Sequence, residues 1–362
     1  MNGIRLLVVT DSFAPQFDAQ SRQARQLVDD LVALDHAVRV LTASEGAPDY
    51  RGIEVVRLRD RIGLGSRIRS VLRGDVSAEG SGAGLDVIVV LSPDEFGRAV
   101  LKQAVRVGIP AVVIEQRPLP TYLPSYYAEQ VLARASRLLV TTEWVASGLT
   151  AHGIAAQVWR PGVDTRSYHP GLRDVALHRK WTQERSVAVG YVGEFRKAEG
   201  VKRLAALASV PFVRPVLIGS GRRKAWLQAN LVNPVFTRPT NTGTLGTAIA
   251  SLDLLVHPGR QQSDSLAIGS ALGCGVPVIA PGAGGTAEAV EPRRTGLHFD
   301  RSDPLGLVGA VSELVTDPNL RQQLAANAFA WAQRHDSTRA AQALVEQHLL
   351  PVCVESSRTP AA

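Results

Sequence analysis

Two glycine-containing turns in the second half of the chain have residue types suited to binding a phosphate. Gly219-Ser220-Gly221 follows a strand predicted at 216–218, and Ala283-Gly284-Gly285-Thr286 follows a strand predicted at 276–280. Glycines let backbone N–H groups approach a phosphate, and open α/β sheets bind ligands at the carboxyl ends of their strands. One such turn fits an ordinary strand-to-helix connection equally well, but two turns in the same half favour a nucleotide site.

A second distinctive segment places arginines among apolar residues. The arginines are Arg57, Arg59, Arg61, Arg67, Arg69 and Arg73, and the apolar residues are Leu58, Ile62, Leu64, Ile68, Val71 and Leu72. The pattern fits a basic amphipathic surface that rests on anionic lipid, at about 1 kcal/mol per basic residue near the membrane. It fits an ordinary basic helix face equally well, and both interpretations stay open.

Alternating strands and helices must position these residues. In the first half, strands are expected at 4–9, 37–41, 53–58, 86–90 and 111–114, with helices at 21–34 and 99–107. In the second half, strands are expected at 186–191, 216–218, 252–257 and 276–280, with helices at 201–207 and 266–273. Such alternation predicts parallel sheets that are covered by helices on both faces.

The length of 362 residues predicts two domains, since a domain usually holds roughly 100 to 200 residues. Pro161-Gly162-Val163-Asp164 and His169-Pro170 interrupt the alternation, so we place the interdomain hinge there. We expect one Rossmann-like domain at 1–166 and a second at 167–336. A helix at about 337–350 should pack back onto the first domain, and the tail at 353–362 should be disordered.

The composition narrows the class of partner. A net charge of +7 and a pI of about 9.8 favour anionic partners. Nucleic acid is the least favoured of these, because aromatic residues make up only 5% and no RRM, KH or helix-turn-helix signature is visible. No apolar run approaches about 18 residues and no signal-peptide pattern opens the chain, so we expect a cytoplasmic protein. Cys274 and Cys353 lack the spacing of a zinc site or a disulfide framework.

Further motifs extend along nearly the whole chain, to about residue 350. In chain order they are Val9-Thr10-Asp11-Ser12-Phe13-Ala14-Pro15-Gln16, Pro161-Gly162-Val163-Asp164, Tyr168-His169-Pro170, Val189-Gly190-Tyr191-Val192-Gly193, His257-Pro258-Gly259, Gly275-Val276-Pro277-Val278, Ala283-Gly284-Gly285 and Arg294-Thr295-Gly296-Leu297. In order and spacing they resemble the retaining family-4 glycosyltransferases, in particular the mannosyltransferases of actinobacterial lipoglycan synthesis. The resemblance implies the GT-B fold, an α/β fold of two Rossmann-like domains whose parallel sheets face each other across a cleft.

The chain departs from this family at positions that contact the nucleotide-sugar donor. The arginine and lysine with which the family clasps the donor diphosphate are replaced by Glu194 and Glu199. The two family glutamates that bind the sugar hydroxyls and the ribose fall on Gln262 and Ser270. Gln262 can hydrogen-bond a hydroxyl without carrying a charge, and Ser270 is too short to reach where a glutamate carboxylate would lie.

Two more family positions lie in the first half. A glycine that lets the backbone approach the donor is Ala19 here, whereas Gln116 agrees with the family's catalytic-site histidine or glutamine. The loop around Glu194 leaves two possibilities. It could be a charge-mixed turn without a ligand, or its cations Arg196 and Lys197 could take over the phosphate contacts.

The resemblance implies metal-independent, retaining transfer of a hexose such as mannose from a nucleotide-diphosphate sugar to a lipid or glycan acceptor. Metal-free transfer also fits the absence of an Asp-x-Asp pair, and no cofactor is expected besides the donor itself. The donor side would comprise the replaced positions above together with the backbone amides of Gly219, Gly221, Gly284 and Gly285. The acceptor side, with peripheral contact to an anionic membrane, would comprise Arg59, Arg61, Arg67, Arg69, Tyr122 and Tyr126.

Two rival functions remain. A catalytically lapsed member of the family would bind a glycan, a lipid or a partner protein without transferring a sugar. A sugar epimerase on the same fold would need an acid/base set, for which Asp94, Glu95 and Glu115 are available without a pattern that selects them.

Overall fold

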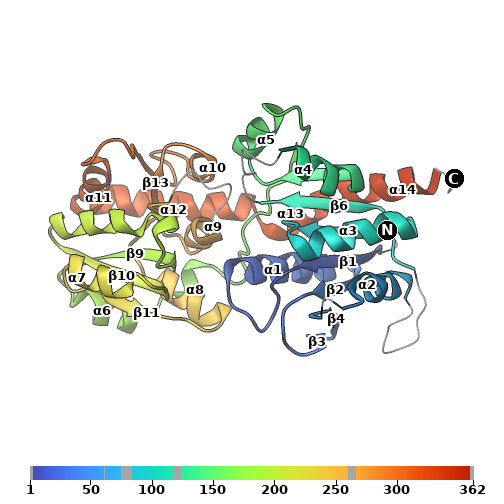
Figure 1. Ribbon diagram of the computed structural model, residues 1–362. Coiled ribbons are helices and arrows are strands. Elements are labelled where there is room, and N and C mark those ends of the chain that lie inside the picture. Colours follow the sequence, from blue (N-terminus) through green and yellow to red (C-terminus); the bar gives the residue numbers. More distant parts are fainter. Residues whose placement is uncertain (1–2, 61, 75–83, 117–123, 260–265, 359–362) are drawn as a thin grey trace. The chain divides into compact units, whose positions relative to one another are not determined.

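The computed structural model describes residues 3–60, 62–74, 84–116, 124–259 and 266–358. The chain divides into two compact units (Figure 1). Unit 1 comprises Met1–Pro161 together with Ser337–Ala362, and unit 2 comprises Gly162–Asp336. Within the described residues, no helix has the length and apolar character needed to cross a membrane.

Unit 1 is built on a sheet with the strand order β3-β4-β2-β1-β5-β6-β7-β8. The strands are β1 (Arg5–Thr10), β2 (Ala37–Thr42), β3 (Asp49–Tyr50), β4 (Ile53–Arg57), β5 (Val87–Leu91), β6 (Ala111–Glu115), β7 (Arg137–Val140) and β8 (Gln157–Val158). All neighbours are parallel except β3 and β4. In register, Leu6 of the central β1 lies opposite Val38 on one side and Val87 on the other. Consecutive buried apolar residues in β5 and β6 fit a sheet that is covered on both faces.

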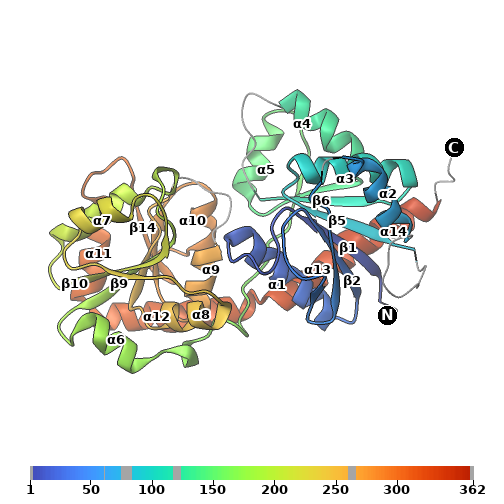
Figure 2. The same cartoon turned by 60° about the horizontal axis from the view of Figure 1, so that its bottom comes forward.

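Helices pack on both faces of this sheet (Figures 1 and 2). On one face lie α1 (Ala19–Ala33), α13 (Ser337–Leu344), the π-helical segment η5 (Val345–Leu349) and α14 (Leu350–Arg358), which bury Leu31, Leu344 and Leu349. On the other lie α2 (Leu64–Arg73), α3 (Glu95–Val107) and α5 (Glu143–Thr150), and the connection from β6 to β7 holds α4 (Pro124–Gln130) and η1 (Leu132–Arg134).

The chain end differs from its prediction. Residues 353–358 continue α14 and are not a disordered tail, whereas 359–362 lie outside the described residues. Val352 is buried in the core of unit 1 and Cys353 packs against it, because this helix covers the apolar face of the sheet. Trp159 Nε1 donates to the Ala340 carbonyl at 2.8 Å and holds the preceding α13 in place.

Unit 2 is built on a parallel sheet with the strand order β11-β10-β9-β12-β13-β14. The strands are β9 (Val187–Glu194), β10 (Val213–Ser220), β11 (Val235–Thr237), β12 (Leu254–Val256), β13 (Val278–Pro281) and β14 (Gly296–Phe299). The helices are η2 (Pro170–Leu172), α6 (Val175–Thr182), η3 (Lys197–Glu199), η4 (Val201–Ser209), α7 (Lys224–Asn230), α8 (Thr242–Ala250), α9 (Leu266–Gly273), α10 (Gly285–Ala289), α11 (Gly306–Thr316) and α12 (Pro318–Arg334). The helix expected at 201–207 is a 3₁₀ helix, η4.

The segment after Pro161 belongs to unit 2, five residues earlier than the predicted boundary at 166. Val163 N–H donates to the His335 carbonyl at 2.8 Å, and the Thr165 hydroxyl donates to the Asp336 carboxylate. Because these bonds join the first residues of unit 2 to its last, both crossings between the units fall at 161–162 and 336–337.

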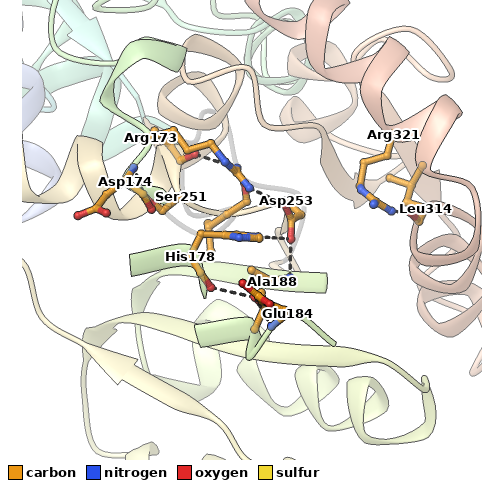
Figure 3. A network of polar contacts seen from close by, with 12 residues as sticks. Arg173, Asp174, His178, Glu184, Ala188, Ser251, Asp253, Leu314 and Arg321 are labelled. Atoms are coloured by element: carbon orange, nitrogen blue, oxygen red, sulfur yellow. Dashed lines mark hydrogen bonds and ion pairs between the residues drawn. The ribbon is translucent and has the colours of Figure 1, made fainter. Parts of the chain in front are cut away.

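A partly buried polar network lies at the amino-terminal edge of this sheet (Figure 3). Asp253, just before β12, accepts a hydrogen bond from Arg173 at Oδ1, at 2.9 Å. Its Oδ2 accepts from the Ala188 N–H at 2.8 Å and lies 2.9 Å from His178 Nε2. Burial alone would raise the pKa of the Asp253 carboxyl, but the hydrogen bonds from His178, Ala188 and Arg173 lower it below its usual value. The network ties α6 to β9 and β12.

Candidate functional site

The carboxyl ends of four adjacent strands in unit 2 meet at one edge of the sheet. β9 pairs with β10 and β12, and β12 pairs with β13, all in parallel. The loops that follow them, 195–200, 221–223, 257–259 and 282–284, therefore lie along the same edge. The two predicted glycine turns fall at the ends of β10 and β13, although Gly219 and Ser220 still belong to β10 and Gly285 and Thr286 already belong to α10. Open α/β sheets bind ligands at such strand ends. We call this edge the donor edge, because the sequence predicts that a nucleotide-sugar donor binds at it.

The end of β10 and the turn after it need glycine because they lie directly against the end of β9 and the loop after it. Gly219 and Gly221 have φ of +144° and +150°. A Cβ on Gly219 would lie 2.0 Å from the Gly193 carbonyl oxygen, and a Cβ on Gly221 would lie 2.6 Å from the Phe195 nitrogen. These glycines thus have a structural requirement that holds with or without a phosphate.

The turn after β13 leads into α10. Gly284 adopts a φ of +73° and precedes the helix, and Gly285 is its first residue. The buried Thr286 hydroxyl lies 3.0 Å from the Ala283 carbonyl oxygen and 3.3 Å from that of Pro281, so it ties the helix to the strand end. The backbone amides of this turn lie at the donor edge.

The loop after β9 neutralises its own charges. Arg196 Nε lies 2.6 Å from a Glu194 oxygen, and the same guanidinium lies 3.9 Å from Glu199. Glu194 also accepts a hydrogen bond at its carbonyl from the Tyr191 hydroxyl at 3.0 Å, and burial, with Glu199 and Glu194 adding to it, raises the pKa of Tyr191. Lys197 is exposed in this loop. The two glutamates therefore hold the arginine that the sequence offered as a phosphate ligand.

His257, after β12, is a buried residue of the donor edge that the predicted site omitted. It is 6% exposed, and burial lowers the pKa of its imidazole to about 4, so the ring is neutral at neutral pH. A Cβ on Gly259 would lie 2.7 Å from His257 Nε2, and a Cβ on Gly200 would lie 2.5 Å from the Pro258 carbonyl oxygen. The motif His257-Pro258-Gly259 at a strand end was the signal that could have identified it.

The two positions that replace the family glutamates lie around α9. Ser270 is 2% exposed, and its hydroxyl donates to the Leu266 carbonyl of its own helix at 2.7 Å. The hydroxyl hydrogen of Ser270 is therefore already engaged in a hydrogen bond within α9. Gln262 lies outside the described residues.

A polar cluster lies at the carboxyl ends of β5 and β6 in unit 1. Gln116 N–H donates to the Ser92 hydroxyl at 3.3 Å and to Glu115 Oε1 at 3.1 Å. Ser92 has a φ of +44°, which is uncommon for a residue with a side chain. The Tyr127 hydroxyl approaches the buried Glu115 at 3.4 Å. Sequence reasoning found Gln116 but missed Ser92, because only the pairing of β5 with β6 brings them together.

Ala19 is the exposed first residue of α1. The preceding Asp18 caps the helix by accepting from Ser21 N–H at 2.8 Å, and it also accepts from the Ser12 hydroxyl at 2.5 Å. Ala19 therefore lies beside the loop that follows β1.

The basic segment is largely engaged within unit 1. Arg59 pairs with Glu45, Arg67 lies 3.5 Å from Asp60, and Arg69 donates to Gln103 at 3.0 Å. The apolar residues Ile68, Val71 and Leu72 are buried against α3, which favours the ordinary helix face over a membrane surface. Tyr126 is 47% exposed with Arg98 over its ring, whereas Arg61 and Tyr122 lie outside the described residues.

Across the described part of the chain, no group of three or more His, Cys, Asp or Glu side chains is arranged to hold a metal ion. The Cys274 thiol is buried, which raises its pKa to about 12, so it is a packing residue of unit 2.

Comparison with known proteins matches both units to glycosyltransferase families. Residues 20–167 match the family described as Glycosyltransferase Family 4, and residues 186–317 match the family described as Glycosyl transferases group 1. The chain is 30% identical to a GDP-mannose-dependent alpha-mannosyltransferase of Mycolicibacterium smegmatis over 87% of this chain and 89% of that protein. It is also 30% identical to a protein of the same description from Corynebacterium glutamicum, over 99% of this chain and 91% of that protein.

Solved structures share the fold. HepE of Anabaena in complex with UDP-glucose has a TM-score of 0.78 at 18% identity, covering 95% of this chain and 99% of that chain. Sucrose-phosphate synthase of Thermosynechococcus elongatus has a TM-score of 0.76 at 18% identity, covering 97% and 100%. The predicted GT-B fold is confirmed. With two glycosyltransferase families matched and full-length relatives at 30% identity, the chain belongs to the GT-B glycosyltransferases, in the family that includes the GDP-mannose-dependent α-mannosyltransferases of mycobacteria and corynebacteria.

Proposed function

We propose that the chain transfers a mannosyl residue from GDP-mannose to a lipid or glycan acceptor, with retention of configuration and without a metal. The observation that carries this proposal is the 30% identity to a GDP-mannose-dependent alpha-mannosyltransferase along 89% of that protein's length. It is supported by the donor edge, where the turns at Gly221 and Gly284 carry backbone amides at the carboxyl ends of two strands of the same parallel sheet.

The donor would bind on unit 2, with its phosphates at the glycine turns. The neutral imidazole of His257 can donate one hydrogen bond and accept another without adding charge. Gln116, whose backbone N–H donates to the Ser92 hydroxyl and to Glu115, is the catalytic candidate of unit 1. The acceptor would bind on the side of unit 1, for which Tyr126 is an exposed candidate.

The direct test is transfer from labelled GDP-mannose to a membrane lipid extract and to soluble mannosides, with products identified by mass spectrometry. Proton NMR of the product decides retention, and an assay with EDTA decides metal dependence. Gly285→Leu should abolish transfer by crowding the turn. Gly309→Leu, the same change at an exposed position of α11 where a Cβ meets open space, should leave transfer intact. Absence of transfer from every sugar nucleotide tried, with a folded chain, contradicts the proposal.

A second function is a lapsed member of the family that binds a glycan, a lipid or a partner without transferring sugar. Two observations favour it: Arg196 is held between Glu194 and Glu199, and the Ser270 hydroxyl is committed to its own helix. A lapsed protein without a donor site should show no thermal stabilisation by any nucleoside diphosphate. By contrast, binding at about 100 times the Kd stabilises a protein by about 2.7 kcal/mol.

A further inference from the structure

Three consecutive cations follow the glycine turn after β10. Arg222 and Arg223 lie in the loop, and Lys224 is the first residue of α7. Arg222 and Lys224 are exposed and Arg223 is half-buried. The loop is on the donor edge, where the sequence reasoning considered only the backbone amides of the glycines.

Hydrogen bonds attach this loop to the loop after β9. Phe195 N–H donates to the Ser220 carbonyl at 2.8 Å, and Arg223 N–H donates to the Phe195 carbonyl at 2.9 Å. Phe195 lies between Glu194 and Arg196 in sequence, and Ser220 lies opposite Glu194 in the paired strands. The run of cations therefore begins beside the loop in which the family's diphosphate ligands are replaced.

Aromatic packing places the third cation near the same loop. The Lys224 ammonium lies over the Phe236 ring, 5.3 Å from its centre. The Phe236 ring in turn packs edge-on against the buried Phe195 ring at 5.8 Å. Lys224 is thus held on the β11 side of the donor edge.

The two loops differ in their charge balance. Arg196 lies near both Glu194 and Glu199, so the two carboxylates balance the charges of Arg196 and Lys197 in the β9 loop. Among the described residues, Arg222 and Arg223 form no ion pair with any carboxylate. The β10 loop therefore carries positive charge that a bound anion can neutralise.

We propose that Arg222 and Arg223 bind the donor diphosphate in this chain. They would take the place of the arginine and lysine that the family resemblance expects at Glu194 and Glu199. A guanidinium binds phosphate oxygens through two parallel N–H donors, which suits it to this role better than an ammonium. The identity of the ligand as a sugar nucleotide rests on the proposed function. The role of the two arginines requires only that a diphosphate binds at the donor edge.

The test compares two charge-matched double variants of the full chain. Arg222→Gln/Arg223→Gln removes the proposed ligands. Lys180→Gln/Arg185→Gln removes two exposed cations that precede β9, at the opposite end of that strand. Calorimetry with GDP and with inorganic pyrophosphate should show at least about a hundredfold loss of affinity in the first variant only, as expected for two charge-assisted hydrogen bonds.

A conservative variant separates ligand binding from a folding defect. Arg222→Lys/Arg223→Lys keeps the charge and loses the paired donors, so it should retain part of the affinity for pyrophosphate. The melting temperature of each variant without ligand should match that of the native chain, because both arginines are outside the core.

The outcomes separate this inference from the proposed function. If the native chain transfers mannose and the Arg222→Gln/Arg223→Gln variant binds GDP as tightly as the native chain, the inference is wrong and the function stands. If the native chain binds GDP through these arginines but transfers no sugar, the inference stands and the function fails. If it binds neither GDP nor pyrophosphate, both are overturned.

Discussion

Arg196 Nε lies 2.6 Å from a carboxylate oxygen of Glu194. Glu194 ends β9 and Arg196 lies in the loop that follows, at the donor edge. Arg196 therefore forms an ion pair with Glu194, and the family resemblance expects a phosphate-binding arginine at the position of Glu194. In the proposed donor site, this pair leaves the loop after β9 with less positive charge for an anion.

Restoring the cations of this loop should strengthen nucleotide binding. The double change Glu194→Arg with Glu199→Lys removes like-charge repulsion and adds two donors, each worth about 1.5–3 kcal/mol toward a phosphate. Calorimetry should show GDP affinity rising by at least about tenfold, while transfer remains slow because Gln262 and Ser270 are unchanged. Glu184→Arg, a charge change just before β9, is the control. Unchanged affinity in the double variant would place the diphosphate elsewhere.

Gly221→Val should destabilise unit 2 even without ligand. Its Cβ would lie 2.6 Å from the Phe195 nitrogen, and a φ of +150° is strained for a residue with a side chain, at about 1–3 kcal/mol. Urea unfolding should report at least this loss. At the exposed helix position Gly309, where a Cβ meets open space, Ala should stabilise by up to about 1 kcal/mol. Equal stabilities for the Gly221→Val and native chains would contradict the close approach of the two loops.

Asp253→Asn should weaken unit 2 and remove part of its acid sensitivity. The pKa of Asp253 is lowered in the folded chain, so its contribution is present above the pKa of the unfolded chain and is lost as pH falls through the folded value. Weakening the hydrogen bonds to this partly buried carboxylate costs about 1–3 kcal/mol. Stability measured between pH 7 and pH 3 should fall less steeply in the variant. Parallel curves would show that the carboxylate does not titrate with folding.

The free energy of unfolding should fall as the solution is acidified toward pH 4, because His257 is buried as a neutral ring. Burial lowers its pKa to about 4, so the unfolded chain takes up a proton near pH 6.5 that the folded chain excludes. This difference in proton binding contributes about 3 kcal/mol to the free energy of unfolding. The contribution is fully present above about pH 6.5 and is lost as pH falls through 4. The His257→Gln variant should lack this slope. NMR titration of the ring in the native chain should give a pKa well below 6, and a value near 6.5 would refute the buried neutral state.

The sequence alone determined the architecture and the edge at which a ligand can bind. Apolar runs such as Val87–Leu91 and the three-to-four spacing in α1 are local patterns, and each predicts its own element. Since every strand of a parallel α/β unit runs in the same direction, the turns after Ser220 and Pro281 had to lie at one edge of the sheet. The family was identified from ordered motifs, and the comparisons confirmed it.

Only the tertiary structure decided which charges face one another at that edge. Glu194 and Arg196 are neighbours in sequence, but whether they pair or point apart depends on how the loop turns after β9. Arg223 lies beside Phe195 because β9 and β10 are adjacent and in register, although 28 positions separate them in the chain. The packing of Val352 likewise required knowing which face α14 covers. Such contacts depend on the order and register of distant segments, and periodicity within one segment carries no information about them.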